Sequence, residues 1–242
     1  MAAEVLLDHE QQYKMLEAEI LRFVHKPGDI ISESSLCQRF GLSRTPARSL
    51  LQRLQSNGLI RIEPKRGSIV TKLNLNVINQ LIYERFAVET MVLRDYIAAC
   101  NPADVERVRF LFYQLKDVAA PYFDDREAFD TSRFLTVDLS MHSEWFRRMN
   151  LDYLWQRLSS PQSSYTRFCM LDILSGNNVP DVLEEHGQLL HLIESGNTTD
   201  LEPLLRRHLY GGIRRIGSRI YTTYVDYFEP FGGDERAAFK ET

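Results

Sequence analysis

The sequence predicts a mainly α-helical protein in two parts: an N-terminal winged helix-turn-helix over residues 1–75 and an all-α helical bundle over residues 76–242. Three observations lead to this prediction. Apolar residues recur with helical spacing along most of the chain. Two short β-like runs lie close together at residues 59–62 and 68–71. Positive charge is concentrated between Arg39 and Lys72.

Three helices open the first part. Apolar side chains from Leu16 to Val24 predict an amphipathic helix over residues 10–25, which the turn residues Lys26-Pro27-Gly28-Asp29 end. A second, short helix follows over residues 33–40. Ser43 is expected to be the N-cap of a third helix, because serine oxygens accept hydrogen bonds from free amides at a helix start.

A β-hairpin is expected directly after the third helix, which Asn57-Gly58 stops. Residues 59–62 and 68–71 are short, branched runs typical of strands, and Pro64-Lys65-Arg66-Gly67 is the turn between them. Three helices followed by such a hairpin wing are the order of elements in a winged helix-turn-helix.

The second part is helical in period throughout. Residues 73–76 are interpreted as the linker, and residues from about Phe228 onward as a frayed tail. Proline and glycine residues separate the helical stretches. The expected helices lie near residues 76–99, 102–120, 124–149, 151–175, 179–195 and 198–226.

Charge is distributed unevenly along the chain. Between Arg39 and Lys72 there are eight basic residues and one acid, Glu63. Residues 1–75 carry a balance of +3, so that the total of −4 leaves −7 for residues 76–242. A basic module joined to an acidic one is the pattern expected when only the first part meets nucleic-acid phosphates.

No targeting or membrane feature is apparent in the sequence. No run of about 18 apolar residues exists, and the acidic N-terminus argues against a signal peptide. Cys37, Cys100 and Cys169 are far apart and odd in number, as expected of reduced thiols. We therefore expect a cytoplasmic protein without a membrane partner.

The third helix is the expected DNA-reading element, because a helix of this kind enters the major groove. Arg44, Thr45 and Arg48 lie at its N-terminal end. The two arginines share a face, and arginine suits a bidentate contact to guanine. The wing tip, Lys65-Arg66-Gly67, is placed for backbone or minor-groove contact. The alternative is that these cations only solvate an exposed face.

A divalent metal site is the second candidate. Asp138 and His142 are four residues apart and share one face of a predicted helix, and His186 and His208 lie on later helices. One carboxylate and three imidazoles that converge in a bundle suit a metal ion such as Zn²⁺ or Ni²⁺. By spacing alone, an Asp-x-x-x-His pair is more often a surface pair or a hydrogen-bonded one.

The first part resembles the GntR family of bacterial regulators over nearly all of residues 10–72. The resemblance implies that Arg44, Thr45, Arg48 and Gly67 are DNA-contacting positions. Ala47 and Ser49 depart from the residues that the family often has there, and both departures leave the arginines in place. The segments that carry the resemblance are Pro27-Gly28-Asp29-x-Ile31-x-Glu33, Phe40-Gly41-Leu42-Ser43-Arg44-Thr45-Pro46, Gly58-Leu59-Ile60 and Pro64-x-Arg66-Gly67-x-x-Val70.

The second part resembles the FCD ligand-binding domain of the FadR-type branch of that family, over residues 78–209. In metal-binding members of the branch, the ligands are an Asp, the His four residues later and two further His. The resemblance implies that the matching residues here, Asp138, His142, His186 and His208, bind a metal. The segments that carry it are Arg85-x-x-x-Glu89, Asp138-x-x-x-His142, Glu185-His186, Glu194-Ser195-Gly196-Asn197 and His208-Leu209.

An organic acid effector is expected near this metal. Because guanidinium pairs well with carboxylate, Arg85, Arg133 and Arg167 are the candidates to face it, and the family tends to carry arginine at the first and third positions. Each is equally well explained as a surface or salt-bridge arginine.

The leading hypothesis is a homodimeric transcription regulator, repressor or activator, that binds a palindromic double-stranded DNA operator and responds to a small carboxylate metabolite. A metal-dependent enzyme is the main alternative, since a carboxylate and three histidines with open positions can activate water. An interaction scaffold with a vestigial wing is a third.

Overall fold

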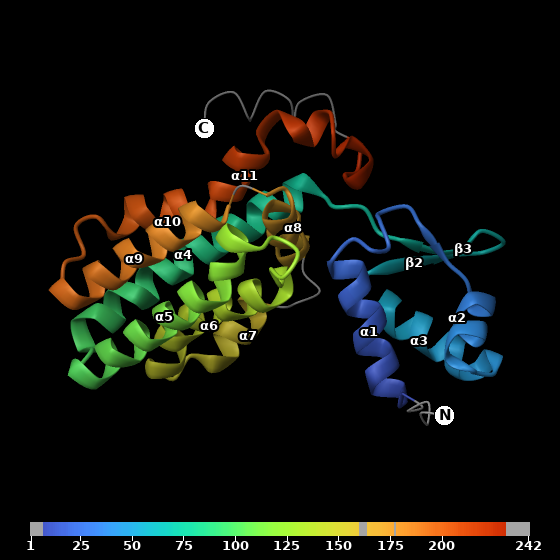
Figure 1. Ribbon diagram of the computed structural model, residues 1–242, viewed down its shortest axis with the longest axis horizontal. Coiled ribbons are helices and arrows are strands. Elements are labelled where there is room, and N and C mark those ends of the chain that lie inside the picture. Colours follow the sequence, from blue (N-terminus) through green and yellow to red (C-terminus); the bar gives the residue numbers. More distant parts are fainter. Residues whose placement is uncertain (1–6, 160–163, 177, 231–242) are drawn as a thin grey trace. The chain divides into compact units, whose positions relative to one another are not determined.

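The computed structural model describes residues 7–159, 164–176 and 178–230, which form two compact units (Figure 1). One unit comprises the residues up to Asn76 together with those from Ser218 on. The other runs from Val77 to Gly217. The sequence prediction assigned everything after residue 75 to the helical domain, whereas the structure groups the chain from Ser218 with the N-terminal unit.

Three helices build most of the first unit. Asp8 caps the first helix in a capping box with Gln11, and Ser32 caps the second with Ser35. The first helix ends four residues before its predicted end, because Phe23 adopts a positive φ of 58°. The helices are α1 (His9–Leu21), α2 (Glu33–Phe40) and α3 (Arg44–Ser56).

The predicted hairpin is part of a three-stranded antiparallel sheet with the order β1-β3-β2. In its register, Ile60 lies opposite Val70, and Glu63 opposite Gly67. The edge strand β1 is only two residues long, which is too short for a sequence pattern to indicate it. The strands are β1 (Ile30–Ile31), β2 (Ile60–Glu63) and β3 (Gly67–Val70).

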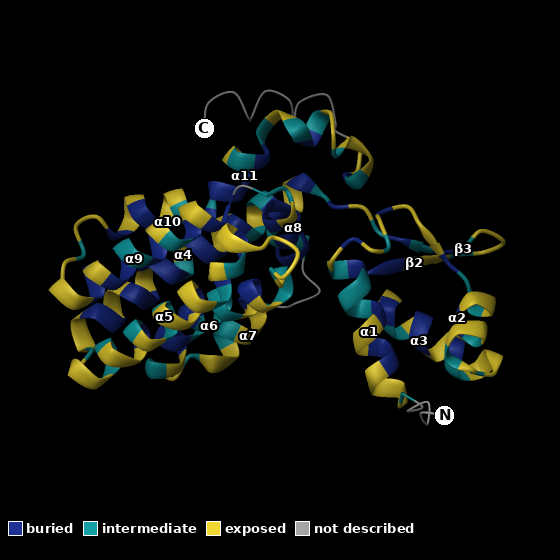
Figure 2. Cartoon of the chain, viewed as in Figure 1, coloured by how far each residue is buried: buried dark blue, intermediate teal, exposed yellow. Residues whose placement is uncertain are grey.

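The core of this unit lies between α1, α3 and the sheet. Leu16 and Ile20 of α1 meet Leu50 and Leu54 of α3, and all four side chains are fully buried. Figure 2 shows buried residues, in dark blue, among exposed ones, in yellow, on both helices. Because the apolar stripe of α3 is used for packing, its opposite face is left to solvent.

The chain at Phe228, where the frayed tail was predicted to begin, pairs with Leu73, and residues 231–242 of that predicted tail lie outside the described residues. The amide of Leu73 donates to the carbonyl of Tyr227 at 2.8 Å, and the amide of Glu229 donates to the carbonyl of Leu73 at 2.8 Å. Phe228 is 1% exposed, and the ring of Tyr227 lies 5.3 Å from that of Phe23. The burial of Phe228 and the contact of Tyr227 with Phe23 hold the segment in place.

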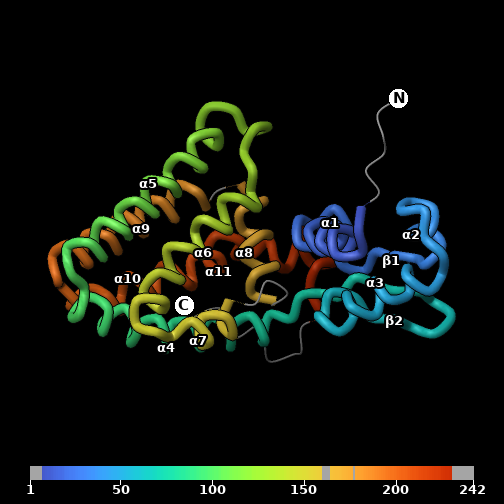
Figure 3. The backbone as a smooth tube through the Cα atoms, turned by 90° about the horizontal axis from the view of Figure 1, so that it is seen from below, coloured from blue at the N-terminus to red at the C-terminus, as the bar shows by residue number. Residues whose placement is uncertain are grey.

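The second unit is a helical bundle. Helix α5 packs against α6 and α9, α9 against α10, and α6 against α7 and α8 (Figure 3). Large side chains such as Trp145, Phe146 and Phe168 fill its interior. Its helices are α4 (Leu75–Ala99, which begins in the first unit), α5 (Pro102–Asp124), α6 (Thr131–Arg148), α7 (Asp152–Leu158), α8 (Ser164–Leu174), α9 (Val179–Ser195), α10 (Leu201–Leu209) and α11 (Gly211–Ile216).

Two predicted helices are divided in the structure. The stretch 151–175 becomes α7 and α8, and residues 160–163 between them lie outside the described part of the chain. The stretch 198–226 becomes α10, α11 and two short 3₁₀ turns, because Gly217 leaves the helix with φ 49°. By contrast, α5 continues past Pro121, whose missing amide affects only its last turn.

The described helices include none that is both long enough and apolar enough to cross a membrane. The structure confirms the predicted class: mainly α, with a winged helix-turn-helix followed by a helical bundle.

Candidate functional site

The start of α3 displays the predicted DNA-reading residues. Ala47 and Leu50 point into the core, so that Arg44, Thr45 and Arg48 are left exposed on the other side of the helix. Ser43 occupies the N-cap position but makes no side-chain cap hydrogen bond. The first-turn amides of α3 therefore keep their capacity to bind an anion such as a phosphate.

Arg48 is held by Glu33, the first residue of α2. Its Nε and Nη2 donate to the two carboxylate oxygens at 2.8 Å and 3.2 Å, which is a bidentate fork. The hydrogen bond from Arg48 is also the main reason that the pKa of Glu33 is lowered. With 61% of its side chain exposed, Arg48 is oriented by this pair but stays accessible from solvent.

The wing tip is basic and exposed. Arg66 donates to Glu63 at 2.9 Å, and Arg61 pairs with the same carboxylate. Gly67 adopts φ 102°, and a Cβ there would lie 3.1 Å from Cγ2 of Ile30. A glycine is therefore required at this position by the backbone of the hairpin itself, before any contact with DNA is considered.

The four predicted metal ligands converge in the second unit. Asp138 and His142 come from consecutive turns of α6, His186 comes from α9, and His208 from α10. One potential ligand atom from each residue lies within 4.8 Å of the others. The tertiary structure thus brings together four residues that are spread over about 70 positions of the sequence.

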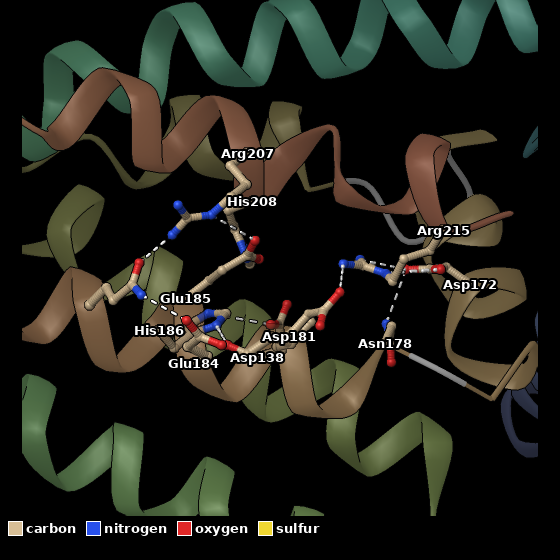
Figure 4. Close-up of polar contacts among 12 residues, drawn as sticks. Asp138, Asp172, Asn178, Asp181, Glu184, Glu185, His186, Arg207, His208 and Arg215 are labelled. Carbon is tan, nitrogen blue, oxygen red and sulfur yellow. Dashed lines mark hydrogen bonds and ion pairs between the residues drawn. The ribbon is translucent and has the colours of Figure 1, made fainter. Parts of the chain in front are cut away.

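Each imidazole is oriented by an acceptor at its Nδ1. Nδ1 of His142 lies 2.7 Å from a carboxylate oxygen of Glu89, and Nδ1 of His208 lies 3.0 Å from one of Glu185 (Figure 4 shows the second pair). Nδ1 of His186 lies 2.8 Å from the carbonyl of Val182. Because a carbonyl only accepts, the last contact places the proton of His186 on Nδ1.

The two carboxylates are ionised acceptors. Burial opposes ionisation of Glu89, but Arg85 and His142 outweigh it and lower its pKa to about 2. Burial likewise opposes ionisation of Glu185, and His208 outweighs it, so that its pKa is lowered. Nδ1 of His142 therefore donates to Glu89, and Nδ1 of His208 donates to Glu185.

Burial also keeps two of the histidines neutral. It lowers the pKa of His142 in spite of the neighbouring Glu89, and it lowers the pKa of His186 to about 3. A neutral imidazole is the form that binds a metal ion. At neutral pH these rings need to lose no proton before they coordinate.

In the resulting arrangement, the Nε2 atoms of the histidines and the carboxylate of Asp138 lie close to one another. Nε2 of His142 and Nε2 of His208 are 3.2 Å apart. Nε2 of His186 lies 3.3 Å from a carboxylate oxygen of Asp138 and has no hydrogen-bond partner among the described residues. Such a group of buried acceptors is unfavourable unless a cation lies among them.

A first-row divalent ion fits this donor set. Nitrogen and oxygen ligands lie about 2.0–2.2 Å from such a metal, so ligands on opposite sides are about 4.2 Å apart. The observed limit of 4.8 Å is slightly wider and needs small side-chain movements only. Three imidazoles and one carboxylate are also the ligand types that Zn²⁺, Ni²⁺ and Fe²⁺ accept in proteins.

The three arginines proposed to face an effector lie in different surroundings. Arg85 is buried and donates to Glu89 at 2.5 Å, which connects it to His142. Arg167 is also buried, and burial lowers its pKa to about 10. Arg133 is exposed near the start of α6, so the structure gives no support to its predicted role.

Two functional residues, Glu89 and Glu185, were quoted in the sequence analysis without a role. Glu89 follows Arg85 by one helical turn, which predicts an ion pair but not its contact with His142, 53 positions away. Glu185 precedes His186 but serves His208, because adjacent helical residues face different directions. No sequence spacing indicates either contact.

Comparison with known families identifies the protein class. The model "Bacterial regulatory proteins, gntR family" matches residues 9–70, and the model "FCD domain" matches residues 80–211. The chain therefore belongs to the GntR family of bacterial regulatory proteins with an FCD domain. It is a DNA-binding transcription regulator of that family.

Individual relatives are distant. The HTH-type transcriptional repressor RspR of Escherichia coli is 22% identical over 83% of this chain and 85% of its own length. The gluconate operon transcriptional repressor of Bacillus licheniformis is 26% identical over 64% of this chain and 62% of its own length.

Solved structures support the fold. A putative GntR regulator from Rhodococcus sp. RHA1 has a TM-score of 0.62 and 20% identity, over 86% of this chain and 97% of its own. McbR/YncC of E. coli has a TM-score of 0.60 and 18% identity, over 89% of this chain and 98% of its own.

Proposed function

We propose that this regulator binds a palindromic operator as a homodimer and releases it in response to a small carboxylate bound beside a divalent metal. The DNA contacts are assigned to Arg44, Thr45 and Arg48 of α3 and to the wing tip, Lys65-Arg66-Gly67. The metal is assigned to Asp138, His142, His186 and His208.

One observation carries the metal assignment: the Nε2 atoms of three buried histidines point toward one another and toward Asp138, while each Nδ1 is hydrogen-bonded to an acceptor elsewhere. A bound divalent ion would supply a Lewis-acidic centre with positions left for carboxylate oxygens. Arg85 adds positive charge next to this group, and its Nη2 is buried with no hydrogen-bond partner among the described residues. Both features favour an anionic effector.

A regulatory role is favoured over metal-dependent hydrolysis by how the nearby carboxylates are engaged. Glu89 is held by Arg85 and His142, Glu185 by Arg207 and His208, and Asp172 by Arg215. A general base needs a carboxylate that is available to accept a proton from water. These three are used to orient other side chains.

Repression is favoured over activation because two relatives, RspR and the gluconate operon regulator, are named transcriptional repressors. The effector would act by binding one arrangement of the dimer's two DNA-binding heads better than another. Operator affinity then changes only by the ratio of the effector's affinities for the two arrangements.

The DNA-binding proposal is tested by titrating the intact protein with duplex DNA at increasing salt, with light scattering to measure its oligomeric state. We expect a dimer whose association weakens steeply with salt, since phosphate contacts release counterions. A monomer, or DNA binding that salt leaves unchanged, would contradict the proposal.

The metal proposal is tested by elemental analysis of the purified wild type and of the double variant His142→Ala, His208→Ala. We expect close to one metal ion per chain in the wild type and a loss of that ion in the double variant. His191→Ala is the matched control, because His191 is an exposed histidine on the same helix as His186. A double variant that retains a full equivalent of metal would exclude the site.

A further inference from the structure

A small cavity adjoins the four-residue metal cluster and extends away from it. Asp138 and His208 line it at the metal cluster. Asp172 of α8, Asn178 at the N-cap of α9 and Arg215 of α11 also line it. Its volume is about 40 Å³, enough for a few water-sized groups. Because the cavity is small, only a short effector can bind at the metal and also contact this second set of side chains.

Arg215 is hydrogen-bonded to two aspartates. Its Nη2 donates to Asp172 at 2.7 Å, its Nε donates to the same carboxylate, and its Nη1 donates to Asp181 at 3.2 Å (Figure 4). Only 13% of the Arg215 side chain is exposed. With its guanidinium engaged on two carboxylates, Arg215 is poorly placed to bind a further carboxylate of a ligand.

Asn178 is the unusual member of the group. Its Nδ2 donates to Asp172 at 3.2 Å, which fixes the orientation of the amide. Its Oδ1 is buried and has no hydrogen-bond partner among the residues that the structure describes. The residue is 5% exposed and lines the cavity. A buried acceptor of this kind calls for a donor from whatever fills the cavity.

The charges around Asn178 favour a neutral donor. The negative charge of Asp172 is offset by Arg215 at hydrogen-bond distance. Asp181, the other partner of Arg215, is 54% exposed and does not line the cavity, so an ammonium group in the cavity would find no uncompensated carboxylate next to Asn178. A carboxylate group would set its own acceptors against Oδ1 of Asn178. A hydroxyl group donates its proton without bringing a charge.

We propose that Asn178, held in place by Asp172, binds a hydroxyl group of the effector, so that the effector is a short hydroxymonocarboxylic acid. The inference rests on the proposed function, in which the effector's carboxylate lies at the metal. It adds a second recognition point, at the other end of the cavity. The hydroxyl concerned is the one farther from the carboxylate.

The test measures affinities of a matched ligand series by isothermal titration calorimetry on the full-length, metal-loaded protein. Lactate, glycerate, isoserine and malate share a 2-hydroxy acid skeleton and differ at the next carbon, which carries hydrogen, hydroxyl, ammonium or a carboxylate. The pair 2-hydroxybutanoate and 2,3-dihydroxybutanoate repeats the hydrogen-to-hydroxyl comparison with four carbons.

We expect the hydroxylated member of at least one pair to bind about tenfold or more tightly than its partner, as a matched hydrogen bond to a buried group provides. In Asn178→Leu this preference should disappear, while binding of the less hydroxylated acid persists. Asn197→Leu is the control, because Asn197 is an exposed asparagine at the other end of α9.

The outcomes distinguish a failure of the hydroxyl assignment from a failure of the proposed function on which it rests. Equal affinity within both pairs, tighter binding of isoserine or malate than of glycerate, or a preference that survives in Asn178→Leu overturns the hydroxyl assignment alone. If none of the acids binds although the metal is present, both the carboxylate effector and the hydroxyl assignment are overturned.

Discussion

His142 and Glu89 are joined across the bundle by a 2.7 Å hydrogen bond, although 53 positions separate them in the sequence. The other oxygen of Glu89 binds Arg85. This chain of three buried groups fixes the ring of His142 with its Nδ1 protonated and its Nε2 available to a metal.

Replacing Glu89 with glutamine should weaken metal binding by about 10–100-fold, the usual effect of losing a hydrogen bond that orients a metal ligand. The amide of glutamine no longer fixes the tautomer of His142, and it leaves Arg85 without its counter-ion. A competition titration with a chromogenic chelator measures the affinity.

Glu184→Gln is the control for this experiment, since Glu184 is exposed on α9 and bonds to Gln188. Circular dichroism of both variants checks that the bundle stays folded. Unchanged metal affinity in a folded Glu89→Gln protein would show that Glu89 does not position His142.

Arg48→Ala should lower the affinity for the specific operator by about 1–3 kcal/mol and reduce discrimination between operator and unrelated DNA. The physical reason is the loss of a guanidinium that Glu33 holds at the exposed start of α3. Fluorescence anisotropy with both DNA sequences measures the two affinities.

Lys14→Ala removes the same charge from an exposed position on α1 and should affect both DNA sequences little. If Arg48→Ala and Lys14→Ala behave alike, the contribution of Arg48 is general electrostatic attraction and not sequence reading.

Phe228→Ala should destabilise the winged-helix unit by about 3–5 kcal/mol, as other deletions of buried aromatic rings do. Phe228 is 1% exposed, and its neighbours in the chain pair with Leu73. Denaturant unfolding measures the change. Val225→Ala, at a residue that is 45% exposed, should cost less than about 0.5 kcal/mol. Equal stability of the two variants would contradict the structural role of this segment.

Glu19 should make the stability of the first unit depend on pH. The hydrogen bonds from Arg39, at 2.7 Å and 2.5 Å, are the main cause of its lowered pKa. A carboxyl whose pKa is lowered by folding stabilises the fold above its unfolded pKa. That contribution is lost as the pH falls through the folded value.

Glu19→Gln should therefore be less stable than the wild type at about pH 7, by roughly 1 kcal/mol or less because the pair is partly exposed. The difference should shrink as the pH is lowered from about 5 toward 3. Urea unfolding at several pH values measures it. A difference that stays constant over this range would exclude the ion pair as its source.

The helices and the wing were largely predictable, because their signals are local. The N-cap position of Ser43, the apolar spacing of α3 and the turn at residues 64–67 act within a few positions. The buried segment around Phe228 was not predictable, because its partners Leu73 and Phe23 are more than 150 positions away.

The candidate site was likewise predictable only in part. Asp138 and His142 are recognisable as a pair from their helical spacing, and the resemblance to the FCD domain implied that His186 and His208 join them. The protonation that makes these histidines ligands depends on Glu89, Glu185 and the carbonyl of Val182.

The sequence by itself determined the class of fold, the basic surface of α3 and the residues able to bind a metal, since residue type and period are properties of the chain. Only the tertiary structure decided which nitrogen of each histidine points into the cluster, that Arg133 is exposed, and that Asn178 has an unmet acceptor. Hydrogen-bond partners and burial arise when distant segments pack together, and residue order alone does not specify them.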